Sequence, residues 1–280
     1  MILTKNGPFA QTMTLPIQRI HAKPRSHGLT MILDKGLGMY ELSDLLTTGG
    51  AYVDFLKLGF GTSLLYPADV LRQKLALAKT HDVIAYPGGT LTEIAYSQNN
   101  FEKFCREATE IGFAALEISD GTISLSERER TAMIATARRS VSVVLSEIGK
   151  KNGSTFSPKI MARQAERDLA AGANYVVVEG REHGHSAGIY DNRGEIDVSL
   201  FEEFLDHLGP ESTTRILWEA PQKTQQVTFM KRFGSEVNLG NIPPNDLLAV
   251  ESLRCGLRSD TLATAMCFSP QNVEVGEQRE

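Results

Sequence analysis

Eight short apolar runs with the composition of β-strands recur along this chain, and segments with the periodicity of amphipathic helices separate them. Strands rich in Val, Ile and Leu that are joined by single helices pair in parallel, because a helical crossover returns the chain to the same end of the sheet. Eight repeats of this unit favour a closed barrel over an open, doubly wound sheet. The sequence therefore predicts an α/β fold, a single parallel (β/α)8 barrel of the TIM type.

Local signals place the elements of this barrel. Ser126 and Glu129 have capping-box spacing at one helix start, and Gly112 and Gly172 stand where two helices should end. The predicted strands cover 29–33, 52–58, 83–86, 114–119, 142–148, 175–180, 214–219 and 236–239. The predicted helices cover 40–48, 67–80, 99–111, 126–140, 157–171, 198–208 and 223–233, with a last helix within 245–266.

The bulk composition fits one globular domain. The chain has 280 residues, of which 41% are hydrophobic, and this length and composition can bury the core of one barrel. We predict a single barrel domain over residues 1–268, with an irregular amino-terminal segment, and a flexible tail over 269–280, where apolar periodicity is lost.

Charge and cysteine content exclude several classes of protein. Lys and Arg number 29 against 34 Asp and Glu, so the net charge is −5 and nothing suggests nucleic-acid binding. The three cysteines are odd in number and lack metal-type spacing, which favours a reducing compartment over a disulfide framework. No run resembles a signal peptide or a membrane span, so we expect a cytoplasmic protein without a membrane partner. A homo-oligomer is compatible with the sequence.

Four of the apolar runs end in a glutamate, namely Glu117, Glu147, Glu179 or Glu219. The carboxyl ends of the strands are where barrels of this type build active sites. The first three glutamates come from consecutive strands and could share a divalent ion, for which oxygen ligands favour Mg²⁺ over zinc. The alternative is that they form buried ion pairs with Lys57, Lys150 or Arg181. Glu219 is expected to orient a lysine or an arginine.

Lysines at the same strand ends are candidate catalytic residues. Lys57 ends the second strand and could neutralise an anionic substrate, while Lys151 or Lys150 could deliver a proton. A Schiff-base lysine is the rival chemistry, and a salt bridge is the structural alternative for each. Asp34, which follows the first strand, completes the catalytic candidates.

The segment that follows the eighth predicted strand is expected to bind phosphate. Barrels often hold phosphate with backbone N–H groups after strands seven and eight. Asn238, Gly240, Asn241 and Arg258 are therefore predicted to bind substrate, together with Arg181 after the sixth strand. Helix capping by Asp260 is the alternative for the last part of this segment.

His183 and His185 lie in a glycine-containing loop after the sixth strand. Two histidines one residue apart could bind a metal. The glycines at positions 180, 184 and 188 instead favour a mobile cover over the site.

Taken together, these motifs resemble those of the phosphosulfolactate synthase family, over residues 23–261. The residues that carry the resemblance are Asp34-Lys35-Gly36, Lys57 with Gly61-Thr62-Ser63, Pro87-Gly88-Gly89-Thr90, Glu117-Ile118-Ser119-Asp120-Gly121, Glu147 with Gly149-Lys150-Lys151, Glu179-Gly180-Arg181-Glu182, Glu219-Ala220-Pro221, Asn238 with Asn241-Ile242, and Leu253-Arg254 with Gly256-Leu257-Arg258. The sequence departs from the family pattern around 183–186.

The resemblance implies a barrel enzyme that depends on Mg²⁺ and adds sulfite to phosphoenolpyruvate. Its product is (2R)-phospho-3-sulfolactate, a precursor of coenzyme M in methanogens and of sulfolactate in some bacteria. Sulfite would attack the methylene carbon, charge would build up on the carboxylate as an enolate, and Lys151, or Lys150 as second choice, would protonate the neighbouring carbon. Two alternatives stay open: another barrel lyase or aldolase acting on a phosphorylated enol or keto acid, and a non-catalytic relative similar to plant heat-stress-associated proteins.

Overall fold

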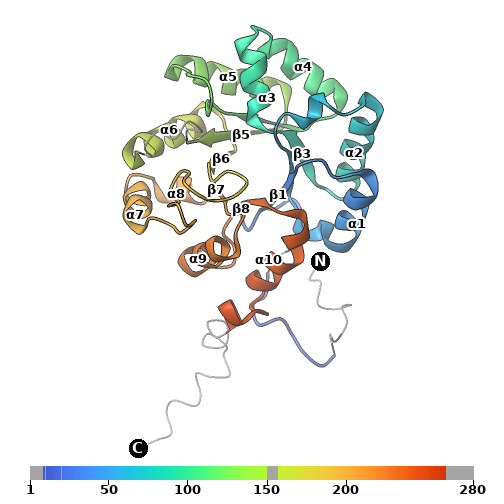
Figure 1. Ribbon diagram of the computed structural model, residues 1–280, viewed down its shortest axis with the longest axis vertical. Helices are drawn as coiled ribbons and strands as arrows, with labels where there is room; N and C mark the ends of the chain where they lie inside the picture. The colour runs from blue at the N-terminus through green and yellow to red at the C-terminus, as the bar shows by residue number, and fades with distance from the viewer. Residues whose placement is uncertain (1–8, 10, 20, 150–156, 263–280) are drawn as a thin grey trace, which may run out of the picture.

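The computed structural model describes residues 9, 11–19, 21–149 and 157–262, in which strands and helices alternate (Figure 1). The strands are β1 (Thr30–Asp34), β2 (Phe55–Leu58), β3 (Ile84–Pro87), β4 (Ala115–Ile118), β5 (Val143–Ile148), β6 (Tyr175–Val178), β7 (Ile216–Glu219) and β8 (Leu239–Ile242). The α-helices are α1 (Met39–Gly49), α2 (Ala68–Thr80), α3 (Gly89–Ser97), α4 (Phe101–Ile111), α5 (Glu127–Ser140), α6 (Pro158–Ala171), α7 (Val198–Asp206), α8 (Pro210–Thr213), α9 (Lys223–Phe233) and α10 (Leu247–Arg254).

The strands form one parallel sheet in the order β3-β2-β1-β8-β7-β6-β5-β4. The two end strands of this order, β3 and β4, also lie side by side, so the sheet curls into a nearly closed barrel. The helices surround the strands (Figure 1). The predicted (β/α)8 barrel is thereby confirmed.

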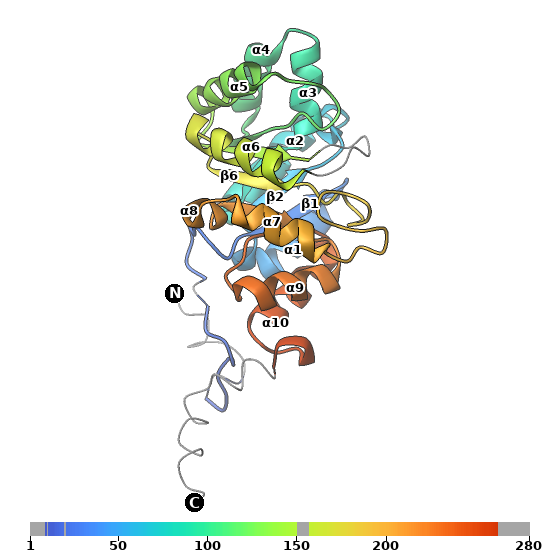
Figure 2. The same ribbon diagram turned by 90° about the vertical axis from the view of Figure 1, so that its left-hand side faces the viewer.

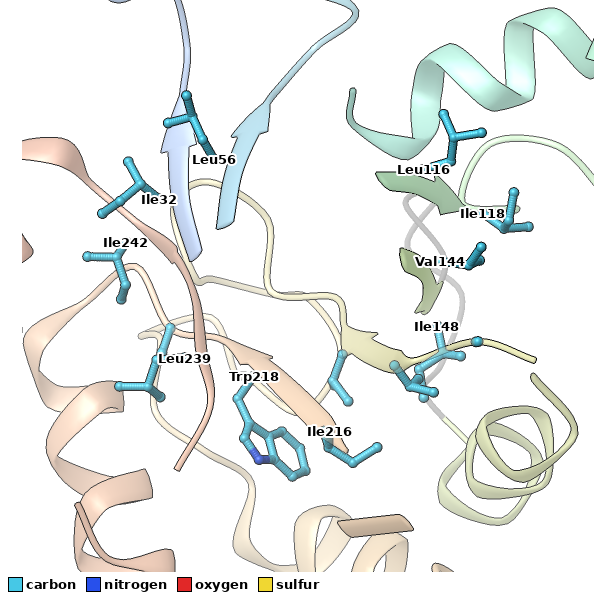
Figure 3. Packing of buried hydrophobic residues seen from close by; sticks show 14 of the residues in the cluster. Ile32, Leu56, Leu116, Ile118, Val144, Ile148, Ile216, Trp218, Leu239 and Ile242 are labelled. Carbon is cyan, nitrogen blue, oxygen red and sulfur yellow. The ribbon is translucent and has the colours of Figure 1, made fainter. Parts of the chain in front are cut away.

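Two hydrophobic layers hold the barrel together. One lies between the strands and the helices, and Figure 3 shows part of it, including Ile32, Leu56 and Trp218. The other fills the barrel interior and contains Leu29, Met31, Phe55, Tyr86, Ala115, Leu145, Val177 and Leu217. Alternate strand residues supply the two layers, since successive side chains of a strand point to opposite faces.

The structure differs from the sequence prediction at two places that matter for the site. Helix α3 was not predicted, because Gly88 and Gly89 indicated only a turn. Strand β8 begins at Leu239, three residues after the predicted start at Glu236. The predicted tail, 269–280, falls outside the described residues.

The carboxyl ends of the strands face one end of the barrel. Figure 2 shows the yellow loop that follows β6 projecting on one side, away from the blue segment that precedes β1. Within the described residues, none of the helices combines the length and the hydropathy needed to cross a bilayer.

Candidate active site

Five charged residues at the strand ends point into the barrel, because each stands two positions after an interior side chain. The interior residues are Phe55, Ala115, Leu145, Val177 and Leu217. Two positions after these, in the same order, stand Lys57, Glu117, Glu147, Glu179 and Glu219. Lys57 is 7% exposed and the glutamates are at most 2% exposed. Because alternate strand residues point inward, these five side chains form a buried charged layer next to the apolar interior, at the carboxyl ends of the strands.

The ammonium group of Lys57 lies among three of these carboxylates. Its Nζ is 3.1 Å from Glu117 Oε1, 2.9 Å from Glu147 Oε2 and 3.0 Å from Glu219 Oε1. A lysine ammonium has three N–H donors, so these carboxylates match its whole donor capacity. The ion pairing that the sequence left open is therefore present for Glu117 and Glu147, and Glu219 orients a lysine, as expected.

This arrangement keeps Lys57 charged. Burial alone would lower the pKa of its ammonium, but the charges of Glu117, Glu147 and Glu219 outweigh burial and raise the pKa well above its usual value. A lysine of this kind neither gives up its proton nor exposes a neutral amine near pH 7. Its chemical role is to supply fixed positive charge.

Backbone N–H groups orient two of the three carboxylates. The N–H of Gly89, the first residue of α3, donates to Glu117 Oε1 over 2.7 Å, and the N–H of Gly180 donates to Glu219 Oε2 over 2.9 Å. A Cβ at Gly89 would stand 2.5 Å from Ser119 Oγ, so only glycine lets the amino terminus of α3 come this close to β4. The positive end of the α3 dipole further stabilises the charge on Glu117.

A cavity of about 270 Å³ opens above this charged layer. Lys57, Glu147 and Glu219 reach it, whereas Glu117 is not among its lining residues. The lining consists of Leu33, Lys57, Gly59, Phe60, Gly88, Gly89, Thr90, Glu147, Glu179, Arg181, Glu182, His183, Glu219 and Asn241. Seven of the eight strands contribute, directly or through the loop that follows, so the cavity lies at the position expected for the active site of such a barrel.

Glu179, Arg181 and Asn241 form one side of the cavity. The N–H of Arg181 donates to Glu179 Oε1 over 2.6 Å, and Asn241 Nδ2 donates to the carbonyl oxygen of Arg181 over 3.1 Å. Arg181 and Asn241 have φ angles of +56° and +52°, a region that costs energy for a residue with a side chain and that often marks functional sites. Asn241 Oδ1 is buried and accepts no hydrogen bond from a described residue.

These contacts decide which side chains suit a divalent ion. Glu147, Glu179 and Asn241 come from β5, from the end of β6 and from β8, all three line the cavity, and each carries a side-chain oxygen. Such a donor set fits Mg²⁺, and the buried Asn241 Oδ1 is a ready acceptor for a cation. Of the predicted metal set Glu117, Glu147 and Glu179, the last two line the cavity. Glu117 Oε1 instead contacts Lys57 and Gly89.

Asp34 faces away from the cavity. It stands two positions after Ile32, which belongs to the outer layer, whereas Leu33 lines the cavity. Its Oδ1 accepts hydrogen bonds from the N–H groups of Gly36 and Leu37, and its Oδ2 pairs with the buried Lys74 over 2.8 Å. In this position Asp34 organises the loop after β1, and the structure does not bring it to the cavity as a catalytic group.

The predicted phosphate segment is divided between the two ends of the barrel. Asn238 precedes β8, and its amide donates to the carbonyl oxygens of Thr214 and Ile216 at the amino end of β7. Gly240 faces the packed interior, where an added Cβ would stand 2.3 Å from Leu217 Cδ2. Asn238 and Gly240 are therefore not in the cavity lining.

The rest of that segment also lacks the expected geometry. The N–H of Asn241 points to Met31 Sδ, and Pro243 and Pro244 have no N–H to offer a phosphate. Arg258 lies outside the cavity lining, 3.9 Å from Asp260. Of the residues predicted to bind substrate, Asn241 and Arg181 reach the cavity. Lys150 and Lys151 lie outside the described residues.

A second group of titratable side chains lies at the opposite end of the barrel. His21, Glu251 and Cys255 approach one another closely enough to hold a metal ion. Arg19 already pairs with Glu251 over 2.5 Å, and His21 Nε2 lies 2.8 Å from the other oxygen of this carboxylate. Burial and the charge of Glu251 raise the pKa of the Cys255 thiol to about 12, which disfavours the thiolate that a metal requires. This group is an ion-pair network that fixes the amino-terminal segment.

Comparison with known proteins places this barrel in a family. A family model described as (2R)-phospho-3-sulfolactate synthase (ComA) matches residues 18–260. The chain belongs to the phosphosulfolactate synthase family. This confirms the resemblance drawn from the strand-end motifs.

Three named relatives are similar to this chain, and the first two carry the name of the enzyme family. A phosphosulfolactate synthase of Methanothermobacter thermautotrophicus is 44% identical over 86% of this chain and 93% of its own length. The corresponding protein of Bacillus subtilis is 36% identical over 89% of this chain and 97% of its length. Protein HEAT-STRESS-ASSOCIATED 32 of Arabidopsis thaliana is 22% identical over 83% of this chain and 87% of its length.

Solved structures support the fold. The YdjI aldolase from Escherichia coli K12 superposes with a TM-score of 0.53 and 13% identity, covering 86% of this chain and 85% of its own. At this identity the similarity shows a shared barrel and no more.

Residues that support this phosphosulfolactate synthase-family site were missed in the sequence. Buried Arg130 of α5 donates to the carbonyl oxygen of Glu147 over 2.8 Å and also pairs with Asp120 and Asp168. Glu93 of α3 accepts a hydrogen bond from the N–H of Gly121 over 2.8 Å and thereby fixes the loop after β4. Glu93 was missed because its helix, α3, was not predicted. Arg130 lies in a predicted helix, and a charged residue on the apolar face of that helix is a signal that could have found it.

Proposed function

We propose that this chain adds sulfite to phosphoenolpyruvate to give (2R)-phospho-3-sulfolactate, with Mg²⁺ as cofactor. The observation that carries the proposal is the buried layer of four glutamates and Lys57 beneath a small cavity, in a chain of the phosphosulfolactate synthase family. A cavity of about 270 Å³ suits substrates of this size better than a large ligand.

The charge balance of the site supports a metal requirement. Both substrates are anions, and the cavity proposed to receive them is lined by Glu147, Glu179 and Glu219. Positive charge close to these carboxylates favours the binding of an anion. Held by Glu147, Glu179 and Asn241, Mg²⁺ would supply that charge next to the substrate carboxylate.

The proposed reaction forms one carbon–sulfur bond. The sulfur lone pair of sulfite attacks the methylene carbon of phosphoenolpyruvate, and the electron pair of the double bond moves toward the carboxylate. A proton then joins the neighbouring carbon, so no leaving group departs and the phosphate ester stays intact. In this proposal Arg181 binds one anionic group of the substrates at the rim of the cavity, and Lys57 keeps Glu147 and Glu219 in place.

The proton has to come from a residue other than Lys57, whose raised pKa makes it a poor acid. Lys151 remains our first candidate and Lys150 our second, both on the basis of sequence. Tyr86 is buried near Lys57, but burial and the charge of Glu117 raise its pKa well above the usual value, so it too is unsuited to give up a proton.

The state of Lys57 also bears on the rival chemistry. A Schiff base needs a neutral amine, whereas Lys57 is buried among three carboxylates that keep it charged. Treatment with borohydride in the presence of phosphoenolpyruvate or a keto acid should therefore leave Lys57 unmodified. A trapped adduct on Lys57 would favour the aldolase alternative.

Sulfite-dependent consumption of phosphoenolpyruvate by the purified chain tests the proposal. We expect turnover that stops when Mg²⁺ is chelated and returns when it is restored. Glu147→Gln and Glu179→Gln should both weaken Mg²⁺ binding, measured directly by calorimetry, and Glu195→Gln on the loop surface is the matched control. Failure of the wild-type chain to bind Mg²⁺ or phosphoenolpyruvate would favour a non-catalytic relative.

A further inference from the structure

We propose that His183 is a substrate-binding residue of this site, whose Nε2–H donates a hydrogen bond to an oxyanion of the substrates. The inference rests on the proposed function for the identity of those oxyanions, which are sulfite and the phosphate or carboxylate of phosphoenolpyruvate. It depends on where His183 lies, on which of its ring nitrogens carries the proton, and on how firmly its loop is held.

His183 lies at the rim of the cavity. His183 follows Arg181 and Glu182 in the loop after β6 and lines the cavity together with them. Its side chain is exposed at the rim, where a substrate must pass or rest. Among the described residues, none accepts a hydrogen bond from its Nε2, so this atom is available to a ligand.

The hydrogen bonds of the loop assign the tautomer. The backbone N–H of His185 donates to His183 Nδ1 over 3.1 Å, so Nδ1 is an acceptor. In a neutral imidazole the proton then lies on Nε2, which becomes a donor. Protonation of Nδ1 would place two N–H groups against each other. The loop therefore maintains His183 as a donor at Nε2 and disfavours the opposite tautomer.

Gln222 and His185 hold the imidazole ring of His183 in place. Gln222 Nε2 donates to the carbonyl oxygen of His183 over 2.6 Å and lies 2.9 Å from His185 Nε2. The two imidazole rings stack, with centroids 5.7 Å apart and planes 27° from parallel. Gln222 immediately precedes α9, so a residue on the neighbouring β7–α9 connection positions the histidine pair.

Further hydrogen bonds anchor the loop to the barrel. Gln225 Nε2 donates to the carbonyl oxygens of Gly184 and Gly194, and the hydroxyl of Tyr190 donates to the carbonyl oxygen of Glu219. At Gly184, where φ is +69°, an added Cβ would stand 2.4 Å from Gln225 Nε2. These contacts present His183 at a defined place in this structure, and the mobile cover expected from the glycines stays a prediction.

The chemistry of the donor favours an oxyanion over a metal ion. A metal would need a lone pair on one of the two ring nitrogens, but Nε2 carries the proton and the lone pair of Nδ1 accepts the hydrogen bond from the His185 N–H. A neutral N–H donor binds sulfite or phosphate oxygens well, because a hydrogen bond to a charged partner is stronger than one between neutral groups. Arg181, on the same rim, supplies the positive charge.

Two variants separate donation to substrate from support of the loop. In His183→Gln the amide nitrogen can reach the place of Nε2 and keep a donor there. In His183→Asn the side-chain oxygen can take the place of Nδ1 and accept the His185 N–H, but the donor toward the cavity is lost. His207→Gln, at the end of α7 and outside the cavity lining, is the matched control.

Steady-state kinetics with each substrate varied in turn identify the oxyanion. We expect His183→Asn to raise one KM by roughly 10- to 100-fold, the size of one hydrogen bond to a charged group, and His183→Gln to raise it less. A change confined to the KM for sulfite identifies sulfite as the partner, and a change confined to phosphoenolpyruvate identifies that substrate. Both KM values within twofold of wild type, an equal rise in both, or a greater loss in His183→Gln than in His183→Asn would overturn the inference.

Nitrogen-15 NMR of the histidine rings tests the same inference without turnover. In the wild-type chain we expect the proton of His183 on Nε2, and a shift of this signal when sulfite or phosphoenolpyruvate is added. Protonation on Nδ1, or no shift with either anion, overturns the role of His183. Absence of sulfite-dependent turnover together with an anion-induced shift would instead count against the proposed reaction and leave the binding role of His183 standing.

Discussion

Replacing Lys57 by methionine removes the positive charge from the buried layer while keeping an unbranched side chain of similar length. In the wild-type chain the ammonium lies 2.9–3.1 Å from Glu117, Glu147 and Glu219. Loss of one partner from a buried ion pair costs about 3–5 kcal/mol, because it leaves a buried charge uncompensated. For a chain of this size that corresponds to a decrease in Tm of about 6–10 °C. Lys57 contacts three carboxylates rather than one, so we expect at least this decrease.

The pH dependence of the Lys57→Met effect provides an internal check. In the variant, three buried carboxylates repel one another, and binding a proton relieves this repulsion. The folded variant should therefore take up protons more readily than its unfolded chain, so its stability falls as pH rises. The difference in unfolding free energy between wild type and variant should be smaller at pH 5 than at pH 8.

Thermal and urea unfolding, followed by circular dichroism at both pH values, measure this effect. Lys103→Met is the matched control, because Lys103 is 66% exposed and, among the described residues, pairs with the exposed Glu107 alone, so the expected change is less than about 0.5 kcal/mol. A Tm of Lys57→Met within 1 °C of wild type would show that Lys57 does not stabilise the buried carboxylates. So would a stability deficit that grows toward acid pH.

The remaining predictions concern single residues. Lys151→Ala should abolish turnover without changing the circular dichroism spectrum, and normal activity would remove Lys151 from the mechanism. Gly89→Ala should lower activity and should lower the free energy of unfolding by about 1–3 kcal/mol, because the added Cβ would stand too close to Ser119. Gly38→Ala should be well tolerated, because the nearest atom to its added Cβ would be 3.6 Å away. Burial opposes ionisation of Glu251, but hydrogen bonding from His21 and the charge of Arg19 prevail and lower the pKa of this carboxyl from 4.5 to about 2. The stability that the ionised Glu251 contributes is therefore present above pH 4.5 and is lost as the pH falls toward 2. The difference in acid-unfolding free energy between wild type and Glu251→Gln should shrink over that range, and a constant difference would contradict this origin.

Strand alternation explains how much of the site could be predicted. Each of the four glutamates ends a run of apolar residues, which is visible in sequence, and all four turned out to be buried in the barrel mouth. Whether the last side chain of a strand points into the barrel depends on whether it is in phase with the inward-pointing residues of that strand. Asp34 shows this, since it stands one position out of phase with Leu33 and faces α2 instead of the cavity.

The contacts that pair the charges could not be predicted, because they depend on the closure of the barrel. Lys57 and Glu219 are 162 positions apart in sequence, and only the curled sheet brings them within 3.0 Å. The start of the eighth strand was hard to predict for a different reason. Its polar and glycine residues, Asn238 to Asn241, carry little strand signal, so its predicted start lay three residues too early and Asn238 was assigned to the wrong end of the barrel.

A phosphorus-31 NMR time course follows the addition of sulfite to phosphoenolpyruvate that we propose for the site of buried carboxylates and Lys57. With wild-type chain, sulfite and Mg²⁺ present together, we expect the phosphoenolpyruvate signal to be replaced by that of one new phosphate monoester, whose mass matches phosphosulfolactate. Glu147→Gln should show no conversion. A phosphoenolpyruvate signal that persists with the folded wild-type chain, or that decays equally without sulfite, would contradict the claim.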